Sequence, residues 1–165
     1  MEESLKQWLK DHNIQYILYT HPPVFTVPEA REHCGQIPGT HCKNLFLKNK
    51  KTEQLYLVTL PQDKQLDLKI FRKIIGASKV RFASSEDLFE MFGVSPGAVS
   101  PIGLVNDIED KVIFIVDENI WNAKEICCHP NVNNETLQVP RTDFHKLIEA
   151  TNTTIKIMNL PYSES

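Results

Sequence analysis

The sequence predicts a single α+β domain in which helices flank a mixed, partly antiparallel sheet. The chain has 165 residues, a length at which one domain buries roughly two thirds of its unfolded surface. Apolar residues alternate with polar ones in some short runs and recur at helical spacing in others. Strands and helices follow one another without strict alternation, which favours a mixed sheet. No linker, repeat or low-complexity segment divides the chain, so we expect one domain over residues 1–165.

The N-terminal part of the chain predicts two helices and three strands. Leu5, Trp8 and Leu9 recur at helical spacing, and Thr26 stands three residues before Glu29, as in a capping box. Two apolar runs separated by a polar stretch predict a β-hairpin. The expected helices cover residues 3–12 and 27–34, and the expected strands cover residues 15–19, 45–47 and 55–60.

The C-terminal part predicts three more helices and four more strands. Asp67 and Ser84 are N-cap residues of two helices, and Gly76 and Gly93 follow the ends of these helices. Residues 94–106 contain repeated glycine and proline, so we expect a structured loop there. The remaining helix is expected at residues 142–150, and the strands at residues 80–82, 112–116, 136–139 and 154–158.

A lysine stands at the predicted start of an apolar strand. Residues 45–47 are apolar and predict the strand, whereas Gly39, Thr40 and Asn44 are typical of a loop. Lys43 is therefore expected where the chain passes from the surface into the core. Placing a charge at the edge of the core costs free energy, and a functional role would explain why it is kept. Lys43 is therefore a candidate functional residue.

A second candidate feature is the segment GVSPGAVSPIGL, residues 93–104. Glycine permits positive φ angles and close approach of the backbone, whereas proline makes the chain rigid. Such a loop can present backbone N–H groups to a carbonyl oxygen or an anion. On local grounds alone, a tight connection between a helix and a strand explains the segment at least as well.

Composition and charge exclude some classes of protein. The net charge of −3 opposes a large uniform basic surface, so DNA is not an expected partner. No apolar run approaches the roughly 20 residues of a membrane span. The charged segment of residues 1–11 lacks the apolar stretch of a secretory signal. We therefore expect a cytoplasmic protein that contacts no membrane and keeps its four cysteines as thiols.

Two groups of basic side chains are candidate contacts for the phosphates of a nucleic acid. One group lies at the tip of the predicted hairpin, and the other lies on the exposed face of the helix that follows. Because no aromatic residues are interleaved with them, a solvated surface is the simpler explanation. The groups are Lys48, Lys50 and Lys51 in the hairpin, and Lys69, Arg72 and Lys73 in the helix.

Metal and thiol chemistry are alternatives that the spacing does not favour. The segments His33-Cys34, His41-Cys42 and Cys127-Cys128-His129 offer metal ligands. Structural zinc usually takes ligand pairs two to four residues apart, whereas adjacent residues of an extended chain point to opposite sides. Cys42 is a candidate thiol nucleophile with the adjacent His41 as its base. Side chains of sequence neighbours rarely contact each other in that way, and the partners of a catalytic cysteine usually come from elsewhere in the fold. We expect packed thiols, no metal and no cofactor.

Common hydrolase and nucleotide-binding fingerprints are absent, yet three ordered motifs together resemble a known family. The motifs GTHCKNLFL, FGVSPGAVSPIGL and CCHPNVNNETLQVP resemble the YbaK and prolyl-tRNA-synthetase-associated domain family. HPPVFTVPEA near the start extends the similarity over essentially the whole chain. The chain looks most like the free-standing alanyl-tRNA(Pro) deacylases of that family. The resemblance implies one YbaK-like editing domain over residues 1–165.

The resemblance implies trans-editing, which is hydrolysis of the ester that joins a wrong amino acid to tRNA(Pro). A pocket built for proline cannot strongly reject a smaller amino acid by binding alone, so a second site must remove the error. The expected partners are the acceptor end of tRNA(Pro) and, as a further candidate, prolyl-tRNA synthetase. The active-site lysine of the family corresponds to Lys43, with Asn44 as a polar neighbour. The substrate-binding residues implied are Gly97, Ala98, Val99, Ser100 and Pro101 of a Gly-x-x-x-Pro loop, and His129.

The mechanism implied by the resemblance depends on positioning. Lys43 would hold the 3′-terminal adenosine, the backbone of the loop would stabilise an oxyanion, and water or the 2′-OH of the tRNA would do the chemistry. Alanine is the first expected substrate, and serine, cysteine and 2-aminobutyrate are alternatives. Two other classes stay open, namely a non-catalytic tRNA- or synthetase-binding module and a thiol-dependent enzyme that uses Cys42 or Cys127.

Overall fold

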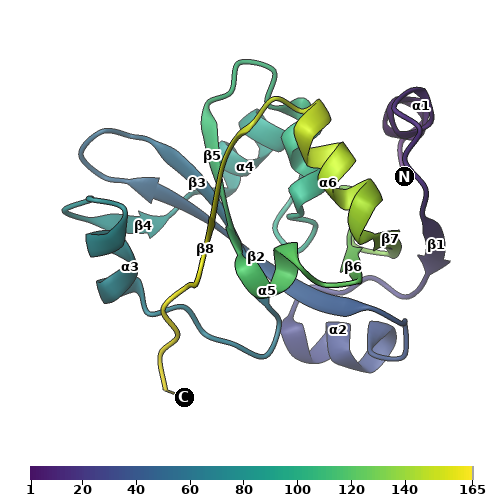
Figure 1. Ribbon diagram of the computed structural model, residues 1–165, viewed down its shortest axis with the longest axis horizontal. Coiled ribbons are helices and arrows are strands. Elements are labelled where there is room, and N and C mark those ends of the chain that lie inside the picture. The colour runs from purple at the N-terminus through teal and green to yellow at the C-terminus, as the bar shows by residue number, and fades with distance from the viewer. Residues whose placement is uncertain (165) are drawn as a thin grey trace.

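A computed structural model of the protein describes residues 1–164 (Figure 1). The helices are α1 (Glu3–Asp11), α2 (Val27–Cys34), α3 (Leu68–Ile74), α4 (Ser85–Phe92), the 3₁₀ helix η1 (Pro101–Asn106), α5 (Glu118–Trp121) and α6 (Arg141–Ala150). The strands are β1 (Ile17–Thr20), β2 (Thr40–Asn49), β3 (Leu55–Pro61), β4 (Val80–Phe82), β5 (Val112–Asp117), β6 (Glu125–Cys128), β7 (Glu135–Pro140) and β8 (Thr154–Met158). No helix among the described residues is long and apolar enough to cross a lipid bilayer.

The eight strands join into one mixed sheet, as the sequence predicts. Their order is β1-β7-β6-β2-β3-β5-β8, and β4 pairs with β2. The pairs β2–β6, β3–β5 and β5–β8 are parallel, and the remaining pairs are antiparallel. Strands that are distant in the chain become neighbours, since β1 lies beside β7 and β8 lies beside β5 (Figure 1).

The longest strand, β2, changes partners along its length. Thr40 and His41 pair in parallel with β6, whereas residues 42–48 pair antiparallel with β3. On the edge opposite β3, β4 pairs only with residues 47–49. The middle of β2 therefore has an edge that neither β6 nor β4 covers, and Asn44 from this part of the strand contacts the loop after α4 through its side chain.

Two hydrophobic clusters pack on opposite faces of the sheet, because successive residues of a strand point to opposite faces. Phe46 and Phe114 belong to the larger cluster, which α1, α4, η1 and α6 cover. Leu47 and Ile115 belong to the smaller cluster, which includes Phe71 of α3. A third cluster packs α2 against β6 and consists of Val24, Cys34, Ile37 and Cys127.

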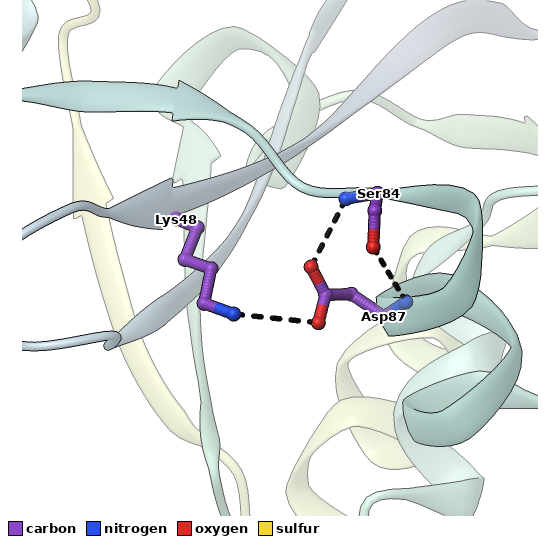
Figure 2. A network of polar contacts seen from close by, with 3 residues as sticks. All are labelled: Lys48, Ser84 and Asp87. Carbon is purple, nitrogen blue, oxygen red and sulfur yellow. Dashed lines mark hydrogen bonds and ion pairs between the residues drawn. The ribbon is translucent and has the colours of Figure 1, made fainter.

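Helix α4 is anchored to β2 at its N-terminus (Figure 2). The Ser84 hydroxyl accepts a hydrogen bond from the Asp87 N–H, and the Asp87 carboxylate accepts one from the Ser84 N–H, each at 3.0 Å. Lys48 of β2 donates to the same carboxylate at 3.4 Å. The hydrogen bonds from Ser84 and the nearby Lys48 lower the pKa of Asp87. Gly93 ends the helix in a left-handed conformation, so the following loop begins at a fixed point.

Most of the predicted elements are confirmed. Helices lie at each of the five predicted places, and the N-caps are formed by Thr26, Asp67 and Ser84. Strands β4 and β8 have the predicted bounds, and the remaining predicted strands differ by a few residues at their ends. The predicted loop of residues 94–106 contains the short helix η1, which Pro101 begins, a position that suits proline.

Three differences between prediction and structure concern the site. Strand β6 and helix α5 were not predicted, and β6 contains Cys127 and Cys128, which are buried strand residues. Strand β2 begins at Thr40, before the predicted start, so Lys43 and Asn44 lie within a strand and not in a loop. Pairing with β3 and β6, which are distant in sequence, outweighs the local loop preference of these residues.

Candidate active site

A pocket of about 210 Å³ lies where the start of α2, the first half of β2 and the loop after α4 meet. Five of the site residues that the family resemblance implies line it, namely Lys43, Asn44, Gly97, Val99 and His129. The rest of the lining consists of Val24, Phe25, Thr26, Val27, Ala30, Cys42 and Gln62. The structure thus brings together three motifs that are far apart in sequence.

Asn44 connects β2 to the loop. Its side-chain amide donates a hydrogen bond to the Val99 carbonyl at 3.3 Å, and its carbonyl oxygen accepts one from the Thr59 hydroxyl. Thr59 is the partner of Asn44 in the β2–β3 register and is fully buried. Asn44 is therefore oriented from both sides, and it holds Val99 at the pocket.

The loop approaches the pocket by its backbone. Gly97 has a φ angle of +95°, and a Cβ atom there would lie 3.3 Å from the Val24 carbonyl oxygen. Among the backbone hydrogen bonds of residues 1–164, none is donated by Gly97, Val99 or Ser100. These N–H groups are free of backbone acceptors, which is the condition for binding an anion or an oxyanion.

The other three loop residues do not line the pocket. The side chains of Ala98, Ser100 and Pro101 are buried. The Ser100 hydroxyl accepts a hydrogen bond from the Ile102 N–H at 3.2 Å and so caps η1. These side chains support the loop, and any contact that they make with a ligand would be through the backbone.

Lys43 is a half-buried cation opposite Leu60 in the β2–β3 register. Burial lowers its pKa, the nearby Arg31 lowers it further, and Asp63 opposes the change. Within residues 1–164 no carboxylate lies within ion-pair distance of Lys43. The ammonium group is therefore available to an anionic or polar ligand.

His129 contributes a hydrogen-bond acceptor to the pocket. Its Nδ1 lies 2.8 Å from the Glu135 carbonyl oxygen and donates to it, so in the neutral ring Nε2 carries the lone pair. Burial lowers the pKa of His129, and the neighbouring His21 and His41 lower it further. Near neutral pH the ring is therefore neutral, with Nε2 as an acceptor.

The four cysteines gather behind the pocket as free thiols. Cys42 lines the pocket, and a small cavity beside it is lined by Cys34, Cys127 and Cys128. Burial raises the pKa of Cys42 and of Cys127 to about 12. A thiol with so high a pKa is a poor nucleophile. Within residues 1–164 no group of three or more potential ligands is arranged to hold a metal ion.

A larger open groove of about 670 Å³ continues from the pocket. It shares Val27, Lys43 and Gln62 with the pocket. Two further cations, Arg31 and Lys64, line it, and the Lys64 ammonium lies 5.7 Å from the centre of the Tyr162 ring. Two carboxylates, of Asp63 and Glu164, line it as well. The sequence analysis missed Arg31 and Lys64 because neither belongs to a basic cluster in the sequence.

The predicted phosphate-binding cations lie away from this groove. Lys50 and Lys51 follow the far end of β2, about 23 Å from Lys43 at the rise of an extended strand. Lys79 and Arg81 lie near Lys50 and lower its pKa. The other predicted cations, Lys69, Arg72 and Lys73, belong to α3. None of these five, nor Lys48 of the same hairpin, lines the pocket or the groove.

The sequence places this fold and pocket in one class of protein, the aminoacyl-tRNA editing domains. Residues 21–147 match the aminoacyl-tRNA editing domain, and the chain belongs to this family. The chain is 34% identical over 152 residues to the prolyl-tRNA editing protein ProX of Acetoanaerobium sticklandii, covering 92% of this chain and 93% of that protein. It is 33% identical to prolyl-tRNA synthetase associated domain-containing protein 1 of Danio rerio, covering 96% of this chain and 87% of that protein.

The same fold is found among solved structures. The crystal structure of a protein described as a candidate trans-editing enzyme for prolyl-tRNA synthetase superposes with a TM-score of 0.73. The similarity covers 99% of both chains at 19% sequence identity, so it concerns the fold alone. The fold class and the resemblance inferred from the sequence are confirmed.

Proposed function

We propose that the protein is a trans-editing deacylase that hydrolyses alanyl-tRNA(Pro), the product of a charging error. The observation that carries the proposal is the convergence of Lys43, Asn44, Gly97, Val99 and His129 on one pocket. Membership of the editing-domain family and the names of the relatives support an action on tRNA(Pro). We expect the acceptor end of tRNA(Pro) to be the partner, and prolyl-tRNA synthetase to be a further candidate.

In this mechanism Lys43 is the catalytic residue that fixes the ester. Its ammonium group binds phosphate or ribose oxygens of the terminal adenosine, and the absence of a carboxylate partner within residues 1–164 leaves it free to do so. Fixing both ends of an already activated ester removes much of the entropic barrier to attack. Asn44 keeps the loop in a fixed position relative to Lys43 through its hydrogen bond to the Val99 carbonyl.

The backbone of the loop stabilises the charge that develops. Water adds its oxygen to the ester carbonyl carbon, and the carbonyl oxygen becomes negative, while the neighbouring 2′-OH of the tRNA orients the water and relays its proton to the leaving ribose oxygen. The free N–H groups of Gly97 and Val99, which line the pocket, are donors for this oxyanion. Collapse breaks the bond to the ribose oxygen, which leaves with the proton that the attacking group loses. His129 Nε2 accepts a hydrogen bond from the attacking water.

Selection against proline is expected to come from the walls of the pocket. Val24, Ala30 and Val99 are apolar lining residues, and Val24 is buried and packed against Cys34 and Ile37. Forcing a ring into a rigid site causes strain, so the alanyl group fits where the pyrrolidine ring does not. Serine, cysteine and 2-aminobutyrate are the alternative substrates, because their side chains are also smaller than the ring.

The proposal is tested by single-turnover deacylation of alanyl-tRNA(Pro). Lys43→Ala should lower the rate by at least about a hundredfold, as expected when a transition-state contact of about 3 kcal/mol is lost. Lys10→Ala, which removes an exposed lysine of α1, is the matched control and should deacylate at the wild-type rate. Unchanged turnover by Lys43→Ala would remove the central claim. Binding of tRNA without any hydrolysis by the wild type would indicate the non-catalytic module instead.

A further inference from the structure

One aromatic side chain at the rim of the pocket is left largely uncovered by the fold. Phe25 lines the pocket, yet its side chain is 67% exposed. Two other phenylalanines are similarly exposed, Phe82 at 58% and Phe89 at 72%, but neither lines the pocket or the adjoining groove. An exposed phenylalanine stabilises the fold little, so a ligand-binding role is a reasonable explanation of Phe25 in this position.

The exposure of Phe25 does not come from a loose backbone. The preceding residue, Val24, is buried, its N–H donates to the Asn133 carbonyl at 3.0 Å, and its carbonyl accepts from the Asn133 side chain at 3.1 Å. The following residue, Thr26, caps α2 by accepting a hydrogen bond from the Glu29 N–H. Phe25 is therefore presented from a backbone that is fixed on both sides.

The neighbouring loop packs against the same residue. A Cβ atom at Gly97 would lie 3.5 Å from Phe25 Cα and 3.7 Å from Phe25 Cδ1. The ring thus lies beside the loop whose N–H groups are free, and on the same pocket as Lys43. An apolar flat surface, a cation and backbone donors are brought together within one small site.

The volume of the pocket determines which part of the substrate meets the ring. Pockets that enclose a drug-sized ligand measure about 300–1,000 Å³, whereas this pocket measures about 210 Å³. It has room for a small aminoacyl group but not for a complete aminoacyl-adenosine. The adenine base therefore lies outside this volume, and the rim of the pocket, where Phe25 is exposed, offers it an apolar surface.

We propose that Phe25 is the stacking surface for the terminal adenine of the tRNA. This inference rests on the proposed function, since it assigns the base of the same substrate. Proteins bind unpaired bases by stacking them on aromatic side chains. With the base on Phe25 and the backbone of the nucleotide at Lys43, the ester is held from two sides at the mouth of the pocket. Phe25 is a positioning residue and takes no part in proton transfer.

The test uses uncharged tRNA(Pro) in which the terminal adenine is replaced by 2-aminopurine, whose fluorescence falls when the base stacks. Wild type and Phe25→Tyr should quench the fluorescence on binding, whereas Phe25→Leu should not. Affinity should fall by about 5- to 150-fold in Phe25→Leu, the range that corresponds to a loss of one base–aromatic stack. Phe89→Leu, which alters an equally exposed phenylalanine of α4, is the matched control and should behave as wild type.

A second measurement identifies the base that is bound. Removal of the terminal adenosine from the tRNA should weaken binding to the wild type and should have little further effect on Phe25→Leu. Equal affinity and equal quenching by wild type and Phe25→Leu would overturn the proposal, and deacylation by that wild-type preparation would leave the proposed function standing. Quenching by the wild type that is lost in Phe25→Leu, without deacylation of any mischarged tRNA(Pro), would support the stacking role of Phe25 and contradict the proposed function.

Discussion

Lys43 is a cation that the fold holds in the middle of a strand at a cost. Burial and the charge of Arg31 both lower its pKa, which means that the folded protein binds this proton less tightly than the unfolded chain does. Near neutral pH the charge on Lys43 therefore lowers the free energy of unfolding, and a protein with an apolar residue at this position would be more stable. Active sites commonly retain such unfavourable groups because function requires them.

The lowered pKa of Lys43 leads to a pH dependence of tRNA binding. The charged form, which holds the phosphate or ribose, is fully present below the lowered pKa and is lost as the pH rises through it. The affinity advantage of wild type over Lys43→Met for uncharged tRNA(Pro) should therefore decline at a pH below about 10.4, the value for an unperturbed lysine. Lys43→Arg, which stays charged, should keep its advantage. An advantage of wild type that persists unchanged through pH 10.4 would contradict the role of the charge.

At the scale of the element, the loop after α4 is rigid at both ends. Gly93 ends α4 and fixes the start of the loop, while the capping box and the ion pair with Lys48 hold the N-terminus of the helix (Figure 2). The Ser100 cap of η1 fixes the end of the loop. Gly97 lies between these anchors with a positive φ, and a Cβ atom there would lie 3.3 Å from the Val24 carbonyl oxygen. Donors for an oxyanion must be fixed before the reaction to be effective, and this construction fulfils that requirement.

Gly97→Ala tests the loop, with Gly93→Ala as the matched control. Both glycines have positive φ, at +95° and +69°, but only a Cβ at Gly97 would meet neighbouring atoms within 4 Å. Both variants should lose about 1–2 kcal/mol of stability, or about 2–8 °C in Tm. Gly97→Ala should also lose deacylation, measured well below its Tm, whereas Gly93→Ala should retain it. Equal rates for the two variants would mean that the backbone of Gly97 does not contribute to the site.

The sequence was informative about elements with strong local signals and uninformative about those formed by distant pairing. The caps of α2, α3 and α4 were predicted because a few neighbouring residues form them. Strand β6 has only four residues and is formed by pairing with β2, which is distant in sequence, so no local pattern predicts it. The extension of β2 to Thr40 depends on the same pairing. The residues in the pocket were predicted largely through the family resemblance. Phe25 was not predicted, since no local pattern reveals which aromatic side chain stays exposed.

At the scale of the whole molecule, the charges that could bind tRNA are divided between two regions. The groove beside the pocket holds Arg31 and Lys64, and the opposite end of β2 holds Lys50 with Lys79 and Arg81. The net charge of −3 provides no general attraction for a polyanion. Binding must therefore depend on one of these local regions, and the groove is favoured because it is continuous with the pocket.

Salt dependence distinguishes the two regions. Arg31→Gln should weaken binding of uncharged tRNA(Pro) and reduce the slope of log K against log salt by about 1, the effect of one lost phosphate contact. The double change Lys50→Gln and Lys51→Gln should leave the slope unchanged. The opposite result would show that the tRNA crosses the hairpin end of β2. A reduced slope for a similar double change at Arg72 and Lys73 would then show that the contact extends to α3.

The central claim is that the pocket admits the alanyl ester and excludes the prolyl ester. The most direct measurement is the ratio of single-turnover deacylation rates for alanyl-tRNA(Pro) and prolyl-tRNA(Pro), with seryl- and cysteinyl-tRNA(Pro) measured alongside. The account predicts rapid hydrolysis of the alanyl ester, a prolyl ester that decays no faster than without protein, and loss of the alanyl rate in Lys43→Ala. Comparable hydrolysis of both esters, or an alanyl rate that does not depend on Lys43, would contradict it.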